Sequence, residues 1–207
     1  MSKLMVYFVS ALLLLLPFVF TVHAQTQPEW LSALRSGGYV IVIRHGATHN
    51  DQADTNPFNL SSIGQQRQLN DAGRMKAKEM GEAFHKLKIP VGDVITSPYF
   101  RAIETGRLAF GKASPTVDVG EGGMIVTPLE SNRRIAALRK LAATPPAAGV
   151  NTVVVSHKPN ILDAFGKDWF DIREAESSIF KPDGNGGYKF IVRVQADDWK
   201  KLAEAVN

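Results

Sequence analysis

The sequence contains no cysteine among its 207 residues. This absence excludes disulfide bonds, thiol catalysis and cysteine-ligated metal sites, so the fold must rest on its packed core. An excess of one charge is also missing, because 24 basic residues face 20 acidic ones and no run of like charges occurs. Such a mild balance gives no indication of a nucleic-acid partner, and it is compatible with a small anionic substrate. We find no internal repeat or low-complexity tract, so an ordinary globular domain is expected.

A long apolar run occurs only at the start of the chain. Lys3 precedes it, the run covers residues 4–22, and a small-residue cleavage pattern closes at Ala24. This layout predicts a secretory signal peptide at 1–24, with the mature chain beginning at Gln25. The alternative is an uncleaved N-terminal anchor, because the run approaches membrane-spanning length. We expect cleavage, no stable membrane span afterwards, and a protein exported to the periplasm or secreted.

The rest of the chain, residues 25–207, alternates between hydrophobic strands and helices and is expected to form a single domain. Continuous apolar runs at 39–43, 91–96 and 152–155 predict buried strands, as in a parallel sheet. Strands at 178–181 and 188–194 flank an Asp-Gly-Asn-Gly-Gly turn and predict a C-terminal β-hairpin. The remaining predicted elements are helices at 30–35, 68–86, 99–110, 130–141 and 160–165 and a short strand at 116–119. This order predicts a three-layer α/β/α sandwich with a mostly parallel sheet.

The helix predicted at 68–86 has a recognisable start and a buried face. Asn70 or Asp71 is expected to cap its N-terminus, because short polar side chains accept hydrogen bonds from the free backbone N–H groups there. Its apolar residues fall roughly on one stripe, which we expect to include Met75 and Met80.

Charged side chains follow three of the predicted buried strands. Arg44 and His45 come after the first, Arg101 shortly after the second, and His157 after the third. Because ligands of open α/β sheets bind beyond the carboxyl ends of the strands, these four side chains are expected to converge. Arginine forks match phosphate oxygens, and a deprotonated, oriented imidazole is a competent nucleophile. The constellation therefore predicts phosphoryl chemistry in which arginine supplies the positive charge, without a metal or other cofactor.

Each of these residues also has a structural alternative. A strand-end histidine often only holds a hydrogen bond, and a lone arginine usually forms a surface ion pair worth about 0–1 kcal/mol. Two histidines could also mark a metal site, but His45 and His157 lack a third ligand at a recognisable spacing. Finding two arginines and two histidines at strand ends together favours anion chemistry.

Four segments of the chain, in order, resemble the histidine phosphatase superfamily (phosphoglycerate mutase-like, branch 1). Residues 44–48 are similar to its Arg-His-Gly-x-Thr signature, and residues 69–77 to its Leu-Thr-x-x-Gly-Arg-x-x-Ala helix start. Residues 97–105 resemble its Ser-x-x-x-Arg-Ala-x-x-Thr segment, and residues 155–157 match its Val-x-His. The resemblance implies a histidine phosphatase-like catalytic domain and a small phosphorylated substrate.

By this resemblance, His45 is the nucleophile that becomes phosphorylated, and Arg44, Arg101 and His157 complete the phosphate pocket. The sequence departs from the family at Asp51, where an Asn is common. Only 55 residues separate Arg101 from His157, and phosphoglycerate mutases carry a longer insertion there. The chain therefore resembles the compact phosphatases, with a mutase-like phosphotransferase and a non-catalytic envelope phosphate-binding protein as alternatives.

The proton donor and the substrate are indicated less directly. Glu121, Glu130 and Glu176 are candidates for the acid that protonates an alkoxide leaving group. We expect Glu176, because compact exported relatives resemble this stretch, and because the family's strand after it starts at the active edge. Residues 179–183 resemble those of lipopolysaccharide core heptose-phosphate phosphatases, which hints at an envelope sugar phosphate.

Overall fold

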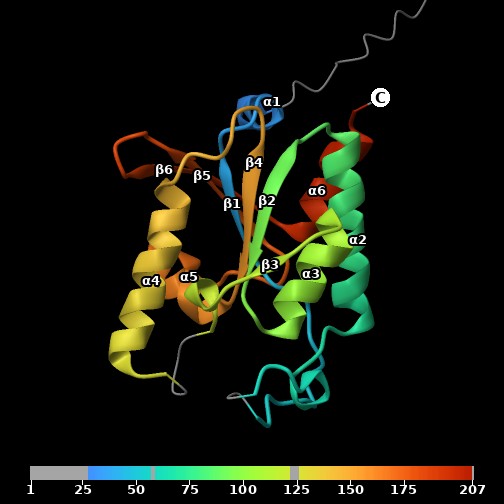
Figure 1. Ribbon diagram of the computed structural model, residues 1–207. Coiled ribbons are helices and arrows are strands. Elements are labelled where there is room, and N and C mark those ends of the chain that lie inside the picture. Colours follow the sequence, from blue (N-terminus) through green and yellow to red (C-terminus); the bar gives the residue numbers. More distant parts are fainter. Residues whose placement is uncertain (1–27, 57–58, 122–125, 207) are drawn as a thin grey trace, which may run out of the picture.

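The structure, a computed structural model, describes residues 28–56, 59–121 and 126–206, so the predicted signal peptide at 1–24 lies outside the described residues. A six-stranded sheet with strand order β3-β2-β4-β1-β5-β6 stands between two layers of helices (Figure 1). The strands are β1 (Val40–Arg44), β2 (Val91–Thr96), β3 (Ser114–Pro115), β4 (Asn151–Ser156), β5 (Ser177–Pro182) and β6 (Tyr188–Val194). The helices are α1 (Glu29–Arg35), α2 (Asp71–Lys86), α3 (Phe100–Phe110), α4 (Pro128–Ala143), α5 (Lys158–Phe165) and α6 (Ala196–Glu204). The predicted three-layer α/β sandwich is confirmed.

The sheet is parallel where the site residues are and antiparallel at one side. β3, β2, β4 and β1 run parallel, and the hairpin β5-β6 is added antiparallel to β1. Arg44 pairs with Ser156, and Thr96 pairs with Val155, so β1, β4 and β2 end at the same level. The segments that follow them therefore meet at one edge of the sheet, the lower edge in Figure 1.

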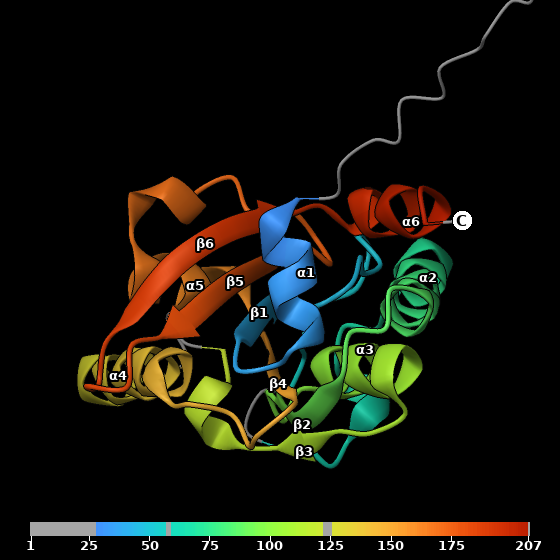
Figure 2. The same ribbon diagram turned by 90° about the horizontal axis from the view of Figure 1, so that it is seen from above.

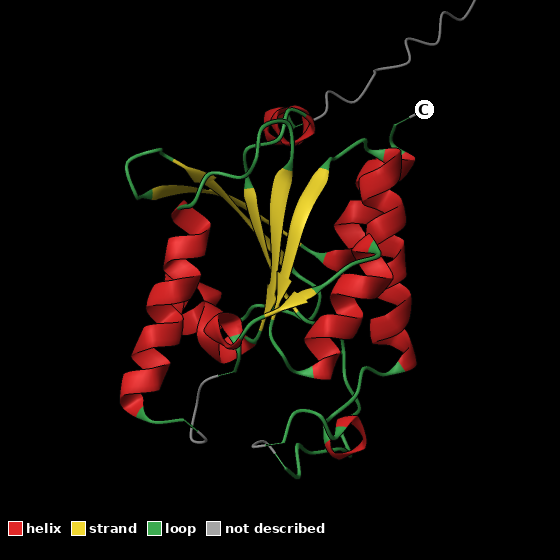
Figure 3. Ribbon diagram, viewed as in Figure 1, coloured by secondary structure: helices red, strands yellow, loops and turns green. Residues whose placement is uncertain are grey.

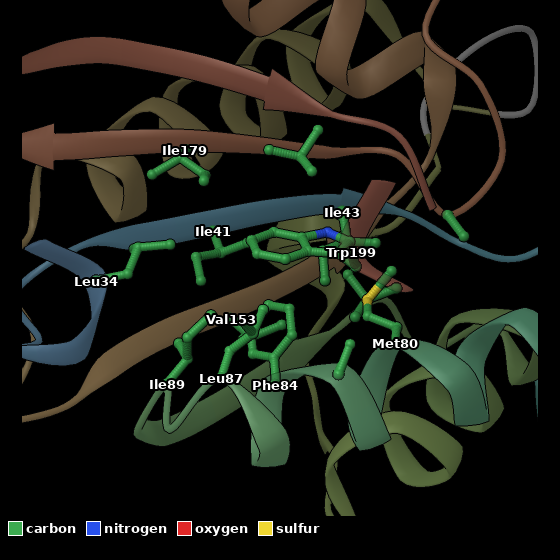
Figure 4. Packing of buried hydrophobic residues seen from close by; sticks show 14 of the residues in the cluster. Leu34, Ile41, Ile43, Met80, Phe84, Leu87, Ile89, Val153, Ile179 and Trp199 are labelled. Carbon is green, nitrogen blue, oxygen red and sulfur yellow. The ribbon is translucent and has the colours of Figure 1, made fainter. Parts of the chain in front are cut away.

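Helices cover both faces of the sheet, as Figures 2 and 3 show. The first layer holds α2, α3 and α6, and its core packs Ile41, Met80 and Trp199 together (Figure 4). The second layer holds α4 and α5, whose Leu138 and Ile161 pack against the other face. Strands buried on both sides require apolar residues at every position, and β1 shows this pattern in its first four residues. No helix in the described part of the chain is long and apolar enough to cross a membrane.

Three local expectations need correction. The strand expected at 116–119 is wrong: Val117–Val119 forms a 3₁₀ helix, η2, because the Thr116 hydroxyl caps it by accepting from the Asp118 N–H at 3.3 Å. Met75 is 53% exposed, since it lies off the stripe on which Met80 is buried. The final helix α6 was not predicted at all. Of the two proposed caps of α2, Asn70 is the one used, and it accepts from the Gly73 N–H at 2.8 Å.

Candidate active site

The four side chains predicted to converge do meet at the edge of the sheet. Arg44 is the last residue of β1 and His45 follows it, while Arg101 lies in the first turn of α3 and His157 caps α5. The imidazole rings of His45 and His157 are 5.1 Å apart between centroids. His45, Arg101 and His157 are all buried, and Arg44 is partly buried. Residues 44, 101 and 157 are far apart in sequence, so the fold itself assembles the cluster.

His45 is held as a neutral imidazole with one nitrogen free. Its Nδ1 lies 2.8 Å from the carbonyl oxygen of Gly46, and a carbonyl can only accept, so Nδ1 carries the proton. The second nitrogen, Nε2, therefore keeps its lone pair. Burial and the positive charge of Arg101 lower the pKa of His45 to about 3. The ring is thus in the form that a nucleophile requires at neutral pH.

A close backbone contact explains why α2 has glycine where it meets the loop after His45. Gly46 lies against Gly73 at the start of α2, and a Cβ added at Gly73 would lie 2.1 Å from the carbonyl oxygen of Ala47. Since no real Cβ tolerates that distance, only glycine lets α2 approach the loop. The resemblance in residues 69–77 thus has a packing reason, because the N-terminus of α2 buttresses the segment that carries His45.

The two arginines already hold partners with their terminal nitrogens. Arg44 donates from Nη1 to the carbonyl of Ile172 at 2.8 Å and from Nη2 to Glu174 at 2.9 Å. Arg101 donates from Nη1 to both carboxylate oxygens of Asp54, at 2.9 and 3.1 Å, and from Nη2 to Glu121. The side chain of Arg101 is wholly buried, so these carboxylates balance a charge that lies away from water.

Three nitrogen atoms of the cluster are buried without a hydrogen-bond partner among the described residues. They are Nε of Arg44, Nε of Arg101 and Nδ1 of His157. Buried polar groups are normally paired, because an unpaired one costs about 1–3 kcal/mol. Three unpaired nitrogens beside one neutral histidine therefore indicate a site shaped for an anion with several acceptor oxygens.

His157 is oriented by its neighbours. Its Nε2 lies 2.7 Å from the hydroxyl oxygen of Ser97, and its Nδ1 lies 3.5 Å from Oε2 of Glu121. Burial, followed by the charges of His45 and Arg101, lowers the pKa of His157 well below its usual value. This ring is therefore also neutral when the pocket holds no anion.

Of the three candidate acids, the structure brings Glu121 to the site. Its carboxylate contacts Arg101 and lies near His157. Glu130, which is partly exposed, instead pairs with Arg133 and Arg134, and these hydrogen bonds lower its pKa to about 2. Such a carboxyl group is a poor proton donor at neutral pH.

The expectation for Glu176 is revised on its contacts. Its backbone carbonyl accepts from the Arg44 N–H at 3.1 Å, so the residue lies at the active edge, directly before β5. Its fully buried carboxylate, however, accepts from Arg193, from Gln195 at 2.6 Å and from the Arg173 N–H at 3.0 Å. A carboxylate with three donors is engaged in holding β6 and the turn before β5. Glu121 is also paired with an arginine, Arg101, but of the three candidates it is the one whose carboxylate lies beside both Arg101 and His157, so position favours it as the candidate acid.

The backbone that carries Glu121 is fixed by side chains from the elements around it. Ser156 donates to the carbonyl of residue 119 at 2.9 Å, Asn160 to that of residue 120 at 2.6 Å, and Arg134 to that of Glu121 at 2.6 Å. Three consecutive carbonyls are thus bound from β4, α5 and α4. The carboxylate of Glu121 consequently starts from an anchored position beside the pocket.

Sequence reasoning missed two charged residues near the pocket. Burial is the first cause of the lowered pKa of His45 and of His157, and the positive charge of Arg67 acts in the same direction on both. The bridge between residues 48 and 69 brings its loop to the active edge. Asp54, the second of these residues, provides one of the two carboxylates on Arg101. The only sequence signal for Arg67 was its place just before the 69–77 segment.

Metal ligands do not gather here. Within residues 28–56, 59–121 and 126–206, no three His, Asp or Glu side chains form a group that could hold a metal ion.

Comparison with known proteins finds a family model that matches part of the chain. The model of the histidine phosphatase superfamily (branch 1) matches residues 40–122, which include His45 and Arg101. The resemblance predicted from the sequence is therefore confirmed, and the comparisons support a phosphatase. A search of curated proteins found no match.

Solved structures share the fold at low sequence identity. The protein histidine phosphatase SixA complexed with tungstate is 18% identical, with a TM-score of 0.51, over 77% of this chain and 98% of that one. A putative alpha-ribazole-5'-P phosphatase from Escherichia coli is 15% identical, with a TM-score of 0.54, over 77% and 98%. A mycobacterial glucosyl-3-phosphoglycerate phosphatase with inorganic phosphate is 15% identical, with a TM-score of 0.53, over 77% and 99%. These likenesses establish the fold.

Proposed function

We propose that this protein is a metal-independent phosphomonoesterase that forms a phosphohistidine on His45. The observation that carries the proposal is the set of three unpaired, buried donors beside a neutral imidazole. Nε of Arg44, Nε of Arg101 and Nδ1 of His157 can each donate to a phosphoryl oxygen. Charge-assisted donors of this kind stabilise the charge that develops on the phosphoryl group during transfer.

The reaction then follows in two steps. In the first, the phosphoryl group of a monoanionic substrate displaces Glu121 from Arg101 and gives it a proton. The Nε2 lone pair of His45 then attacks phosphorus, the bond to the leaving oxygen breaks, and Glu121 passes the proton to that oxygen. In the second, water attacks the phosphohistidine, Glu121 takes one proton from the water, and the Nε2–P bond breaks to release phosphate. Arg44 and Arg101 supply the positive charge throughout, so this scheme needs no metal.

The substrate is proposed only by class. The solved relatives are described as phosphatases of different phosphorylated compounds, so they support the phosphoryl end of the substrate and not the rest of it. The resemblance in residues 179–183 supports an envelope sugar phosphate. That substrate fits an exported protein, and we propose export by way of the signal peptide at 1–24.

The decisive experiment measures phosphate release from an aryl phosphate by wild-type protein and by His45→Ala, both in a strong chelator. Wild-type protein should release phosphate, and the variant should lose activity while it remains folded. Trapped wild-type protein should carry acid-labile phosphate on His45. As a matched control, His85→Ala removes an exposed histidine of α2 and should keep full activity.

Full activity of His45→Ala would refute the mechanism, and a wild type that binds phosphate without turnover would favour a binding protein.

A further inference from the structure

Ser97 and His157 form a buried pair that the proposed mechanism does not yet explain. Both side chains are fully buried, and Oγ of Ser97 lies 2.7 Å from Nε2 of His157. The backbone N–H of Ser97 donates to the carbonyl of Val155 at 2.9 Å, which ties the segment after β2 to β4. The pairing of the strands therefore places the serine within hydrogen-bond distance of the histidine.

The protons around this hydroxyl can be counted. The backbone N–H of Tyr99 points at Oγ of Ser97 at 3.3 Å, and an N–H can only donate, so Oγ accepts there. The hydroxyl still has one proton of its own to place. The described contacts give that proton one acceptor, Nε2 of His157. If Nε2 accepts, the single proton of a neutral imidazole must be on Nδ1.

The position of that proton matters because Nδ1 is the nitrogen that faces the other site groups. It is buried without a hydrogen-bond partner among the described residues, and Oε2 of Glu121 is 3.5 Å away. An Nδ1 that carries a proton can donate to a phosphoryl oxygen. An Nδ1 without a proton would present a lone pair to an anion and repel it.

We infer that Ser97 is a positioning residue that holds His157 as the Nδ1–H tautomer, so that the ring donates a hydrogen bond to the bound phosphoryl group. The inference rests on the proposed function, and it assigns to Ser97 a role that acts through His157 and not through direct contact with substrate. The ring of Tyr99, 5.3 Å from that of His157 between centroids, packs against the imidazole and helps to keep its orientation.

The tautomer is directly measurable in the wild-type protein without any activity. Nitrogen-15 NMR of histidine-labelled protein at neutral pH separates protonated from bare ring nitrogens, and His157→Asn identifies the signals of His157. The expected result is a protonated Nδ1 and a bare Nε2. A protonated Nε2 in wild-type protein would overturn the inference, whatever the enzyme assay shows. Inorganic phosphate should then shift the Nδ1–H signal of wild-type protein.

The second arm tests the serine. Ser97→Ala should weaken the preference for Nδ1–H and reduce kcat/KM for an aryl phosphate by about 10- to 100-fold, the share of a hydrogen bond to a charged group. The matched control is Ser178→Ala, because Ser178 is an equally buried serine whose hydroxyl accepts from the Trp169 ring N–H at 2.8 Å. It should lose stability and leave both the tautomer and kcat/KM unchanged.

The outcomes separate two failures. If Ser97→Ala folds and keeps wild-type kcat/KM and tautomer, the role of Ser97 is refuted while the phosphohistidine mechanism stands. If His45→Ala keeps full activity, the proposed function fails, and the NMR result still decides the tautomer of His157.

Discussion

The burial of His45 makes the stability of this protein depend on pH in a way that can be calculated. The pKa of His45 is about 3 in the folded chain, lowered first by burial and then by Arg101, against an ordinary value of 6.5. Between these two values the unfolded chain binds a proton at this position and the folded chain does not. Stability is therefore fully present above pH 6.5 and is lost as the pH falls below it.

The magnitude follows from the linkage relation. Each pH unit in this window changes the free energy of unfolding by about 1.4 kcal/mol for one proton. Between pH 7.5 and pH 4.5, His45 alone should lower the free energy of unfolding of the wild-type protein by about 3 kcal/mol. The pKa of His157 is also lowered, so it acts in the same direction and remains in both proteins that are compared.

The assay is urea unfolding of wild-type protein and His45→Asn at pH 7.5, 6.5, 5.5 and 4.5. The variant has no imidazole at this position, so its free energy of unfolding should fall less steeply as the pH is lowered. The two slopes should differ by the amount that the binding of one proton contributes. His85→Asn, which removes an exposed imidazole, should follow the wild-type curve. Parallel curves for wild type and His45→Asn would refute the claim that His45 is neutral because it is buried.

Three further predictions concern the acid, the charge and the N-terminus. Glu121→Gln should slow the hydrolysis of an alkyl phosphate by about 10²–10⁴-fold and barely affect an aryl phosphate with a good leaving group. Glu176→Gln should lower the melting temperature and leave the ratio of the alkyl to the aryl rate unchanged. The reverse pattern would restore Glu176 as the proton donor. Dialysis against a strong chelator should leave the rate of phosphate release unchanged. A loss of activity that zinc or magnesium reverses would contradict the proposal that arginines supply the positive charge. N-terminal sequencing of envelope-fraction protein should begin at Gln25, and an intact Met1 on membrane-bound protein would indicate an anchor.

The convergence of the site could be predicted because it depends on strand ends. Parallel strands that are buried on both faces show as continuous apolar runs, and the residues after them must share one edge. Arg44, His45, Arg101 and His157 were found in this way. The rule needs no knowledge of side-chain contacts, which is why it works from sequence.

The choice among acids could not be made in the same way. The Glu130–Arg134 pair lies at i,i+4 within α4 and could have been read from the sequence. The contacts of the other two glutamates could not, because only the folded chain shows that Arg193 pairs with Glu176 and Arg101 with Glu121. Asp54 was missed for the same reason, since its partner Arg101 is 47 residues away. Long-range ion pairs leave no periodic signal in a sequence, and η2 shows that one hydroxyl cap can replace an expected strand.

The guanidinium of Arg101 is already paired with two carboxylates before any phosphate binds. Asp54 and Glu121 act as its resident counter-ions, so an arriving phosphate competes with them for the buried guanidinium. The net gain on binding is the difference between two strong attractions, not the whole of one. Such a site holds an anion less tightly than bare arginines would. Under the proposed function, the same competition would help to release the phosphate product.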